Sequence, residues 1–148
     1  MFSLSDFASK VRPKNRISFG DVQRLSRNIL PDGIGSREDA ELLINLDRDA
    51  ARSDPAWERW LVATIVDFVV WTERPTGIVT EDTAYWLAAT LVGNAGERPT
   101  KIGRRIAREV AQEAQAFENE ALAALGASLS KPKSRRAVRD TETVSMAA

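Results

Sequence analysis

Residues 55–72, PAWERWLVATIVDFVVWT, form the most apolar stretch of the chain and decide how the rest of it is interpreted. Trp57, Leu61, Ile65 and Phe68 recur at helical spacing, and four valines widen their face. A helix that is apolar nearly all round is buried nearly all round. The β-branched residues would also suit a strand, but the length of the stretch favours a helix. We therefore expect a central, buried helix that ends near Thr72.

Asp67 interrupts this apolar stretch, and we expect its carboxylate to be buried. A buried carboxylate is costly unless it has a partner. Two interpretations stay open. Asp67 is either a ligand of a bound ion, or it pairs with an arginine or caps a neighbouring helix.

Outside the central stretch, apolar residues recur at helical spacing in four further segments. These segments follow hydroxyl residues that can cap a helix, namely Ser18, Ser36, Thr80 and Thr100. The last and longest is expected to run from Thr100 to about Leu125. No segment alternates at period two, so the sequence predicts an all-α, single-domain bundle of five to six helices, of which the sixth would lie over residues 3–11.

Two loop-to-helix junctions are alike at a constant offset of 44 residues. Residues 31–43 read PDGIGSREDAELL, and residues 75–87 read PTGIVTEDTAYWL. In each junction a glycine can end one helix with a positive φ, and a hydroxyl residue can cap the next helix. The pattern predicts an internal repeat of two helical hairpins that bury their apolar faces against each other.

The two ends of the chain differ from this middle in composition. Residues 1–16 are polar and basic and are expected to form a solvated N-terminal arm. Residues 17–125 carry the helical periodicity and form the predicted domain. Residues 126–148 lose the periodicity and include the run KPKSRR, so they are expected to be a disordered basic tail.

The composition excludes several kinds of chemistry. The 148 residues contain no cysteine, which removes disulfides and thiolate sites, and no histidine, which removes histidine-based triads and acid–base catalysis. The 21 basic and 21 acidic residues balance, so nucleic acid and anionic membranes are not expected as main partners. There is no secretory signal and no apolar run of the roughly 20 residues that a transmembrane helix needs. We therefore expect a cytoplasmic protein that is not an enzyme.

The first junction, PDGI-x-SRE-x-A at residues 31–40, and the second junction with the preceding DFVV at residues 67–70 resemble TerB-like domains. This helical family is named for a tellurite-resistance protein, and the resemblance covers about residues 17–125 and extends to uncharacterised bacterial members. It implies a cytoplasmic helical bundle with a link to stress response, metal-ion sensing or membrane-linked complexes. It also implies a divalent-cation site whose acidic ligands, matched by position, are Asp32, Glu38, Asp39 and Asp67. The second junction has Thr76 where the first has Asp32.

Aromatic and basic residues supply further candidate contacts. Trp86 lies beside the apolar stripe of its helix, and with Tyr85 it is the aromatic pair that we expect to bind a partner protein. A place in the core is the alternative. Lys101, Arg104, Arg105 and Arg108 form a local basic patch, but no aromatic interleaving indicates nucleic-acid binding.

Three functional hypotheses follow from these patterns. The favoured one is a non-enzymatic protein-interaction or scaffold module without a cofactor, which predicts an exposed apolar or aromatic patch. The alternative is a divalent-cation sensor, which predicts that Asp32, Asp39 and Asp67 converge within coordination distance. The third is an enzyme that uses carboxylates alone, which predicts a deep polar pocket with paired acids. Whether the protein forms a homo-oligomer stays open.

Overall fold

The computed structural model describes residues 3–93 and 98–130 of the chain. The α-helices within these residues are α1 (Leu4–Val11), α2 (Phe19–Arg24), α3 (Arg37–Asp49), α4 (Pro55–Asp67), α5 (Glu81–Val92), α6 (Lys101–Glu113) and α7 (Ala121–Ser130). The strands are only two residues long: β1 (Arg16–Ile17), β2 (Arg52–Ser53), β3 (Ile78–Val79) and β4 (Ala116–Phe117). The all-α fold that the sequence predicts is therefore confirmed. In the described ranges, no helix has both the length and the apolar character needed to cross a membrane.

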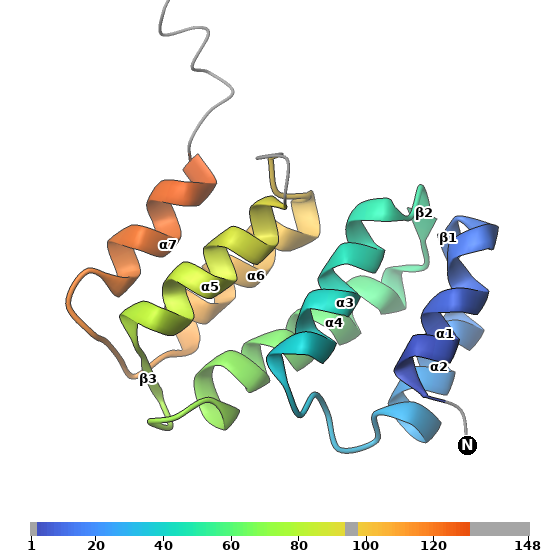
Figure 1. Ribbon diagram of the computed structural model, residues 1–148, viewed down its shortest axis with the longest axis horizontal. Coiled ribbons are helices and arrows are strands. Elements are labelled where there is room, and N and C mark those ends of the chain that lie inside the picture. Colours follow the sequence, from blue (N-terminus) through green and yellow to red (C-terminus); the bar gives the residue numbers. More distant parts are fainter. Residues whose placement is uncertain (1–2, 94–97, 131–148) are drawn as a thin grey trace, which may run out of the picture.

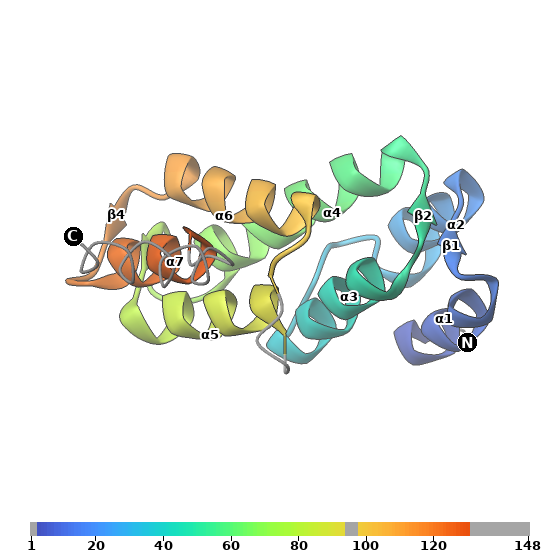
Figure 2. The same ribbon diagram turned by 90° about the horizontal axis from the view of Figure 1, so that it is seen from above.

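The helices are arranged along one long axis (Figures 1 and 2). Helices α1 and α2 lie at one end, α5, α6 and α7 lie at the other, and α3 and α4 lie between them. Each end also holds one parallel strand pair, β1 with β2 and β3 with β4. These strands directly precede α2, α4, α5 and α7, so each pair ties together the starts of two helices that are distant in the sequence.

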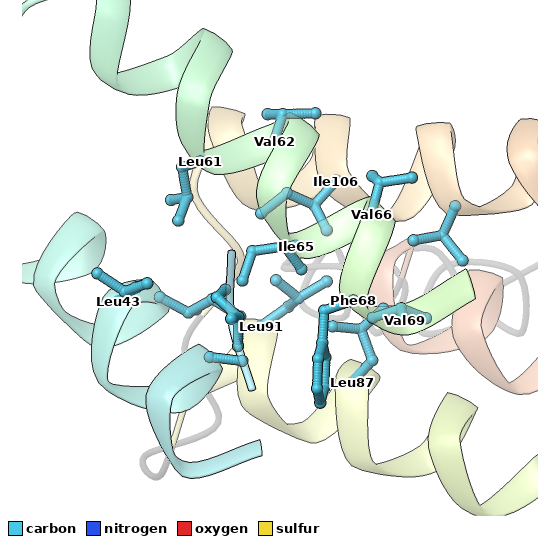
Figure 3. Close-up of a cluster of buried hydrophobic side chains, with 14 of the residues drawn as sticks. Leu43, Leu61, Val62, Ile65, Val66, Phe68, Val69, Leu87, Leu91 and Ile106 are labelled. Carbon is cyan, nitrogen blue, oxygen red and sulfur yellow. The ribbon is translucent and has the colours of Figure 1, made fainter. Parts of the chain in front are cut away.

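The central helix forms as predicted, and a π-helical turn over Phe68–Thr72 continues α4. Its apolar side chains lie among residues of α3, α5 and α6, as Figure 3 shows. The labelled residues of this cluster are Leu43, Leu61, Val62, Ile65, Val66, Phe68, Val69, Leu87, Leu91 and Ile106. Each fully buried leucine or isoleucine stabilises the fold by roughly 1.5–3 kcal/mol relative to exposure. The helix is not buried all round, because Arg59, Ala63 and Asp67 form an exposed stripe at four-residue spacing.

The two junctions share their local geometry. Gly33 has φ of 90° and Gly77 has φ of 82°, a region that glycine enters without steric cost. The backbone N–H groups of Asp39 and Thr83 donate to the hydroxyl oxygens of Ser36 and Thr80, as expected for helix caps. The junctions differ in strand pairing, because the second junction contains β3 whereas residues 31–43, the first junction, contain no strand. A repeat of whole hairpins stays a prediction.

The N-terminal segment is more than a solvated arm. Within its described residues, 3–16, helix α1 begins with a capping box between Ser3 and Asp6. Its apolar residues Leu4, Phe7, Ala8 and Val11 are buried in the common core. The basic residues noted in the sequence lie on the exposed side, so the segment is an amphipathic part of the fold.

The predicted long helix from Thr100 to Leu125 is wrong, because it is divided into α6 and α7. Between them the chain forms β4, and the N–H of Gln115 donates to the carbonyl oxygen of Gly77 at 2.8 Å. Asn119 has a positive φ of 39°, which helix interiors do not accommodate. Backbone bonds to β3 thus replace the helical bonds of this segment.

The last helix continues beyond residue 126, where the disordered tail was predicted to begin. Residues 126–130, which were expected to belong to the disordered tail, form the last part of α7. Residues 131–148 lie outside the described residues, so the tail expected there stays a prediction.

Candidate functional site

The acidic residues predicted to hold a cation lie on different elements. Asp32 is exposed in the turn before α3, Glu38 and Asp39 lie in the first turn of α3, and Asp67 is at the end of α4. Residues 3–93 and 98–130 contain no group of three or more acidic side chains that could hold a metal ion. The convergence that the cation-sensor hypothesis requires is therefore not seen in the described part of the chain.

The predicted burial of Asp67 is wrong. Its side chain is exposed, one helical turn beyond the exposed Ala63. An apolar sequence around a residue does not bury it when that residue falls on the outer stripe of its helix. Asp67 therefore requires neither a buried ion-pair partner nor a ligand.

The buried carboxylate of the N-terminal end is instead Asp21, which is 1% exposed. It accepts hydrogen bonds from the Lys14 ammonium at 3.0 Å, the Arg24 guanidinium at 3.1 Å and the Ser18 backbone N–H at 2.9 Å. Burial raises the pKa of Asp21, but the bonds from Ser18 and Lys14 outweigh burial and hold the pKa below its usual range. The sequence indicates this residue as part of a cap, but the two cations could not be foreseen.

A second internal carboxylate, Asp47, has no cation among its hydrogen-bond donors in the described residues. It accepts from the Thr100 hydroxyl at 2.8 Å and from the Trp57 indole N–H at 3.1 Å, so it joins α3, α4 and the start of α6. Burial raises the pKa of Asp47, and the two hydrogen bonds only partly oppose this effect. Asp47 is a structural junction that joins three helices through its two hydrogen bonds.

The two residues of the predicted aromatic contact, Tyr85 and Trp86, have different surroundings in the structure. The Trp86 indole N–H donates to Glu41 at 2.6 Å, and the Arg37 guanidinium lies 4.9 Å from the centre of its ring. Arg37 in turn bonds Glu73 at 2.8 Å. Trp86 therefore connects α3 to α5 within the molecule. Tyr85 is 56% exposed and remains accessible to a partner.

A groove between α6 and α7 is the apolar surface feature that best fits a binding role. Its volume is about 300 Å³. Its walls are Arg104, Ala107, Arg108 and Ala111 from α6 and Leu122, Leu125 and Gly126 from α7. Leu125 is buried at the base, whereas Leu122 is 49% exposed. The groove thus combines an apolar floor with two guanidinium groups.

Helix α7 contributes an unusual surface to this groove. Its sequence, ALAALGASLS, contains no charged residue. Ala123, Gly126 and Ala127 are exposed along with Leu122, so an uncharged face of the helix meets solvent. A surface helix of a globular protein normally carries charged or polar residues on that face. We call the groove and this exposed side of α7 the α7 surface.

Sequence reasoning missed Leu122 because it predicted one continuous helix through this region. In that helix the apolar stripe ran through Phe117, Ala121 and Leu125 and left Leu122 unremarked. The absence of charge in residues 121–130 was the signal that could have identified the surface. The basic residues of its rim, Arg104 and Arg108, were noted as a patch.

A wider and more polar cavity of about 680 Å³ lies beside Asp21 at the opposite end of the molecule. Its charged lining residues are Lys10, Lys14, Asp21 and Arg24. Among the described residues of this lining, Asp21 is the only acid, and it is already bonded to two of the cations. These residues therefore do not provide the paired acids that carboxylate catalysis requires.

The α7 surface is therefore the feature from which a function can be inferred. Comparisons of the chain with protein-family models, with curated proteins and with solved structures find no match. The inference has to start from the shape, exposure and charge of this surface.

Proposed function

We propose that the protein is a non-enzymatic protein-interaction or scaffold module that binds a partner protein through the α7 surface. The observation that carries the proposal is the uncharged exposed face of α7, with Leu122 at 49% exposure beside an apolar groove. Exposed apolar surface next to a concave site is typical of protein-binding regions.

The energetics of burial favour this use of the surface. Burying a leucine side chain contributes roughly 1.5–3 kcal/mol, and a groove provides contacts on several sides. The groove is formed before any partner binds, because the buried side chains of Leu125 and Ala121 pack α7 against the core. A preformed site loses little conformational entropy when it binds a partner.

The competing hypotheses receive less support from the described residues. The cation sensor requires converging carboxylates, and no group of three or more acids that could hold a metal ion occurs in residues 3–93 and 98–130. The enzyme requires paired acids in a pocket, and the polar cavity beside Asp21 has a single acid among its described lining residues. The TerB-like resemblance, the link to stress response and the cytoplasmic location stay predictions.

Photo-crosslinking from the surface itself tests the proposal. A photoreactive phenylalanine replaces Leu122 in the full chain, which is expressed in the organism that produces it. The matched control carries the same residue at Ala63, which is exposed on the outer stripe of α4. We expect a discrete protein adduct from position 122 and none from position 63. Equal labelling from both positions, or no adduct at 122, would contradict the proposal.

A further inference from the structure

We infer that the occupant of the α7 surface is an amphipathic helix of a partner protein, with apolar residues along one side and carboxylates flanking them. This inference rests on the proposed function and specifies the chemistry of the partner. The apolar floor selects the apolar side of such a helix, and the two arginines at the rim select its acidic residues.

The charge of the groove is one-sided within the described residues. Arg104 and Arg108 lie four residues apart on α6, and no acidic residue lines the groove. Arg104 donates to the carbonyl oxygen of Pro99 at 3.1 Å, and neither arginine forms an ion pair with a described residue. The neighbouring Arg105 provides a contrast, because it pairs with Glu58 at 2.8 Å and Glu109 at 2.7 Å. The groove therefore has guanidinium groups available for external carboxylates.

The groove fits side chains from one side of a short helix. Its lining residues span positions 104–111 of α6 and 122–126 of α7. These stretches are roughly 8–12 Å long, so a few side chains from one or two turns of a partner helix can enter the volume of about 300 Å³. A ridge of leucine-like side chains at helical spacing would enter between the walls beside Leu122, and residues three or four positions apart would reach Arg104 and Arg108 together.

Charge argues against the two occupants that this chain could supply. Residues 131–148, KPKSRRAVRDTETVSMAA, carry five basic and two acidic side chains, so this segment as a whole would bring net like charge to the arginines. A second copy that packed its α7 surface on the first would bring two pairs of arginines together. An acidic partner avoids both repulsions.

The defined probe is a synthetic helical peptide of about 14 residues, stapled so that it is helical before binding. Three versions share one leucine face and differ only in the flanking residues, which are glutamate, glutamine or lysine. Binding to the intact protein is measured by fluorescence anisotropy at low and at physiological salt. We expect the glutamate peptide to bind most tightly and to weaken as salt rises.

Variants of the rim assign the effect to the two arginines. Arg104→Gln with Arg108→Gln is expected to weaken the glutamate peptide roughly tenfold, because each exposed pair contributes a fraction of the total. Arg104→Lys with Arg108→Lys is the conservative control and should retain most of the affinity. Equal affinities of the glutamate and lysine peptides, or no binding of the glutamate peptide at millimolar concentration, would overturn the inference.

Two further outcomes separate this inference from the proposed function. If the adduct at position 122 persists undiminished in the Gln variant, the surface binds a protein but the acidic partner is wrong. If position 122 gives no adduct, the proposed function itself fails. Tighter binding to phosphatidylserine vesicles than to the glutamate peptide would overturn the inference in favour of an anionic membrane.

Discussion

The terminal helices α1 and α7 lie at opposite ends of the molecule (Figure 2). They differ in the kinds of residue that they expose to solvent. Helix α1 buries Leu4, Phe7 and Val11 and turns Asp6 and Lys10 to solvent. Helix α7 buries Ala121 and Leu125 but exposes only small or apolar residues in its described part. Helix α1 therefore presents charged residues on its outer face, whereas α7 has an uncharged face that the described residues of the chain leave uncovered.

The largest expected effect on stability comes from removing the packing of α1 against the core. Phe7→Ala removes a fully buried ring from the contact of α1 with the core. The change should lower the free energy of unfolding by about 3–5 kcal/mol, because the burial of the ring no longer stabilises the fold and its removal leaves a cavity in the core. Urea denaturation followed by circular dichroism measures the loss. A change below about 1 kcal/mol would show that α1 is dispensable for the fold.

The next effect concerns the charges that secure the N-terminal end. Asp21→Asn should lower the free energy of unfolding by about 1–2 kcal/mol at neutral pH, because it weakens the bonds from Lys14 and Arg24. The folded-state pKa of Asp21 is lowered, so its contribution is present above the unfolded value near 3.8 and is lost as pH falls through the folded pKa. Denaturation curves from pH 7 to pH 2 should therefore converge for the variant and the parent protein. A gap that stays constant with pH would contradict this assignment.

Asp47 should behave in the opposite way to Asp21. Its folded-state pKa is raised by burial, so the ionised form is disfavoured at neutral pH and the penalty is relieved as pH falls. Asp47→Asn keeps an acceptor for Thr100 and Trp57 and should raise the free energy of unfolding by up to about 1 kcal/mol at neutral pH. Thermal melts at pH 7 and pH 4 provide the measurement. A loss of stability at pH 7 would mean that the two hydrogen bonds need the charged form.

The smallest expected effect on stability comes from a substitution on the exposed side of α7. Leu122→Gln should change the free energy of unfolding by less than about 0.5 kcal/mol, because the side chain is half exposed in the monomer. The same change should abolish measurable binding of the acidic peptide. The matched control is Leu125→Ala, which should cost about 2–4 kcal/mol because Leu125 is buried. Large destabilisation by Leu122→Gln would show that this residue belongs to the core.

Much of the fold could be predicted from periodicity and caps, because these are local signals. Ser18, Ser36, Thr80 and Thr100 each cap the helix that was predicted to follow them. The break between α6 and α7 could not be predicted, because it depends on backbone bonds from Gln115 and Glu118 to residues about 40 positions earlier. The exposure of Asp67 was missed for a related reason, since the side of α4 that faces solvent depends on where its neighbours pack.

The candidate site was predicted only in part. The basic residues Arg104 and Arg108 were noted, but their role depends on α7, whose separate existence was not foreseen. Trp86 was selected for its type, and its indole bonds within the molecule to Glu41. A binding surface is a property of elements brought together in space, so composition indicates its ingredients but not its location.

The pairing of β3 with β4 has a consequence for how this protein could change over evolutionary time. It places the start of α7 through main-chain bonds, including the bond from the Glu118 N–H to the Val79 carbonyl oxygen at 2.9 Å. Main-chain bonds are indifferent to side-chain identity, so the outer residues of α7 can vary without moving the helix. Substitutions on the exposed side of α7 can then accumulate while the backbone of the fold stays the same. The same property makes α7 a suitable position at which protein engineers could install new specificities.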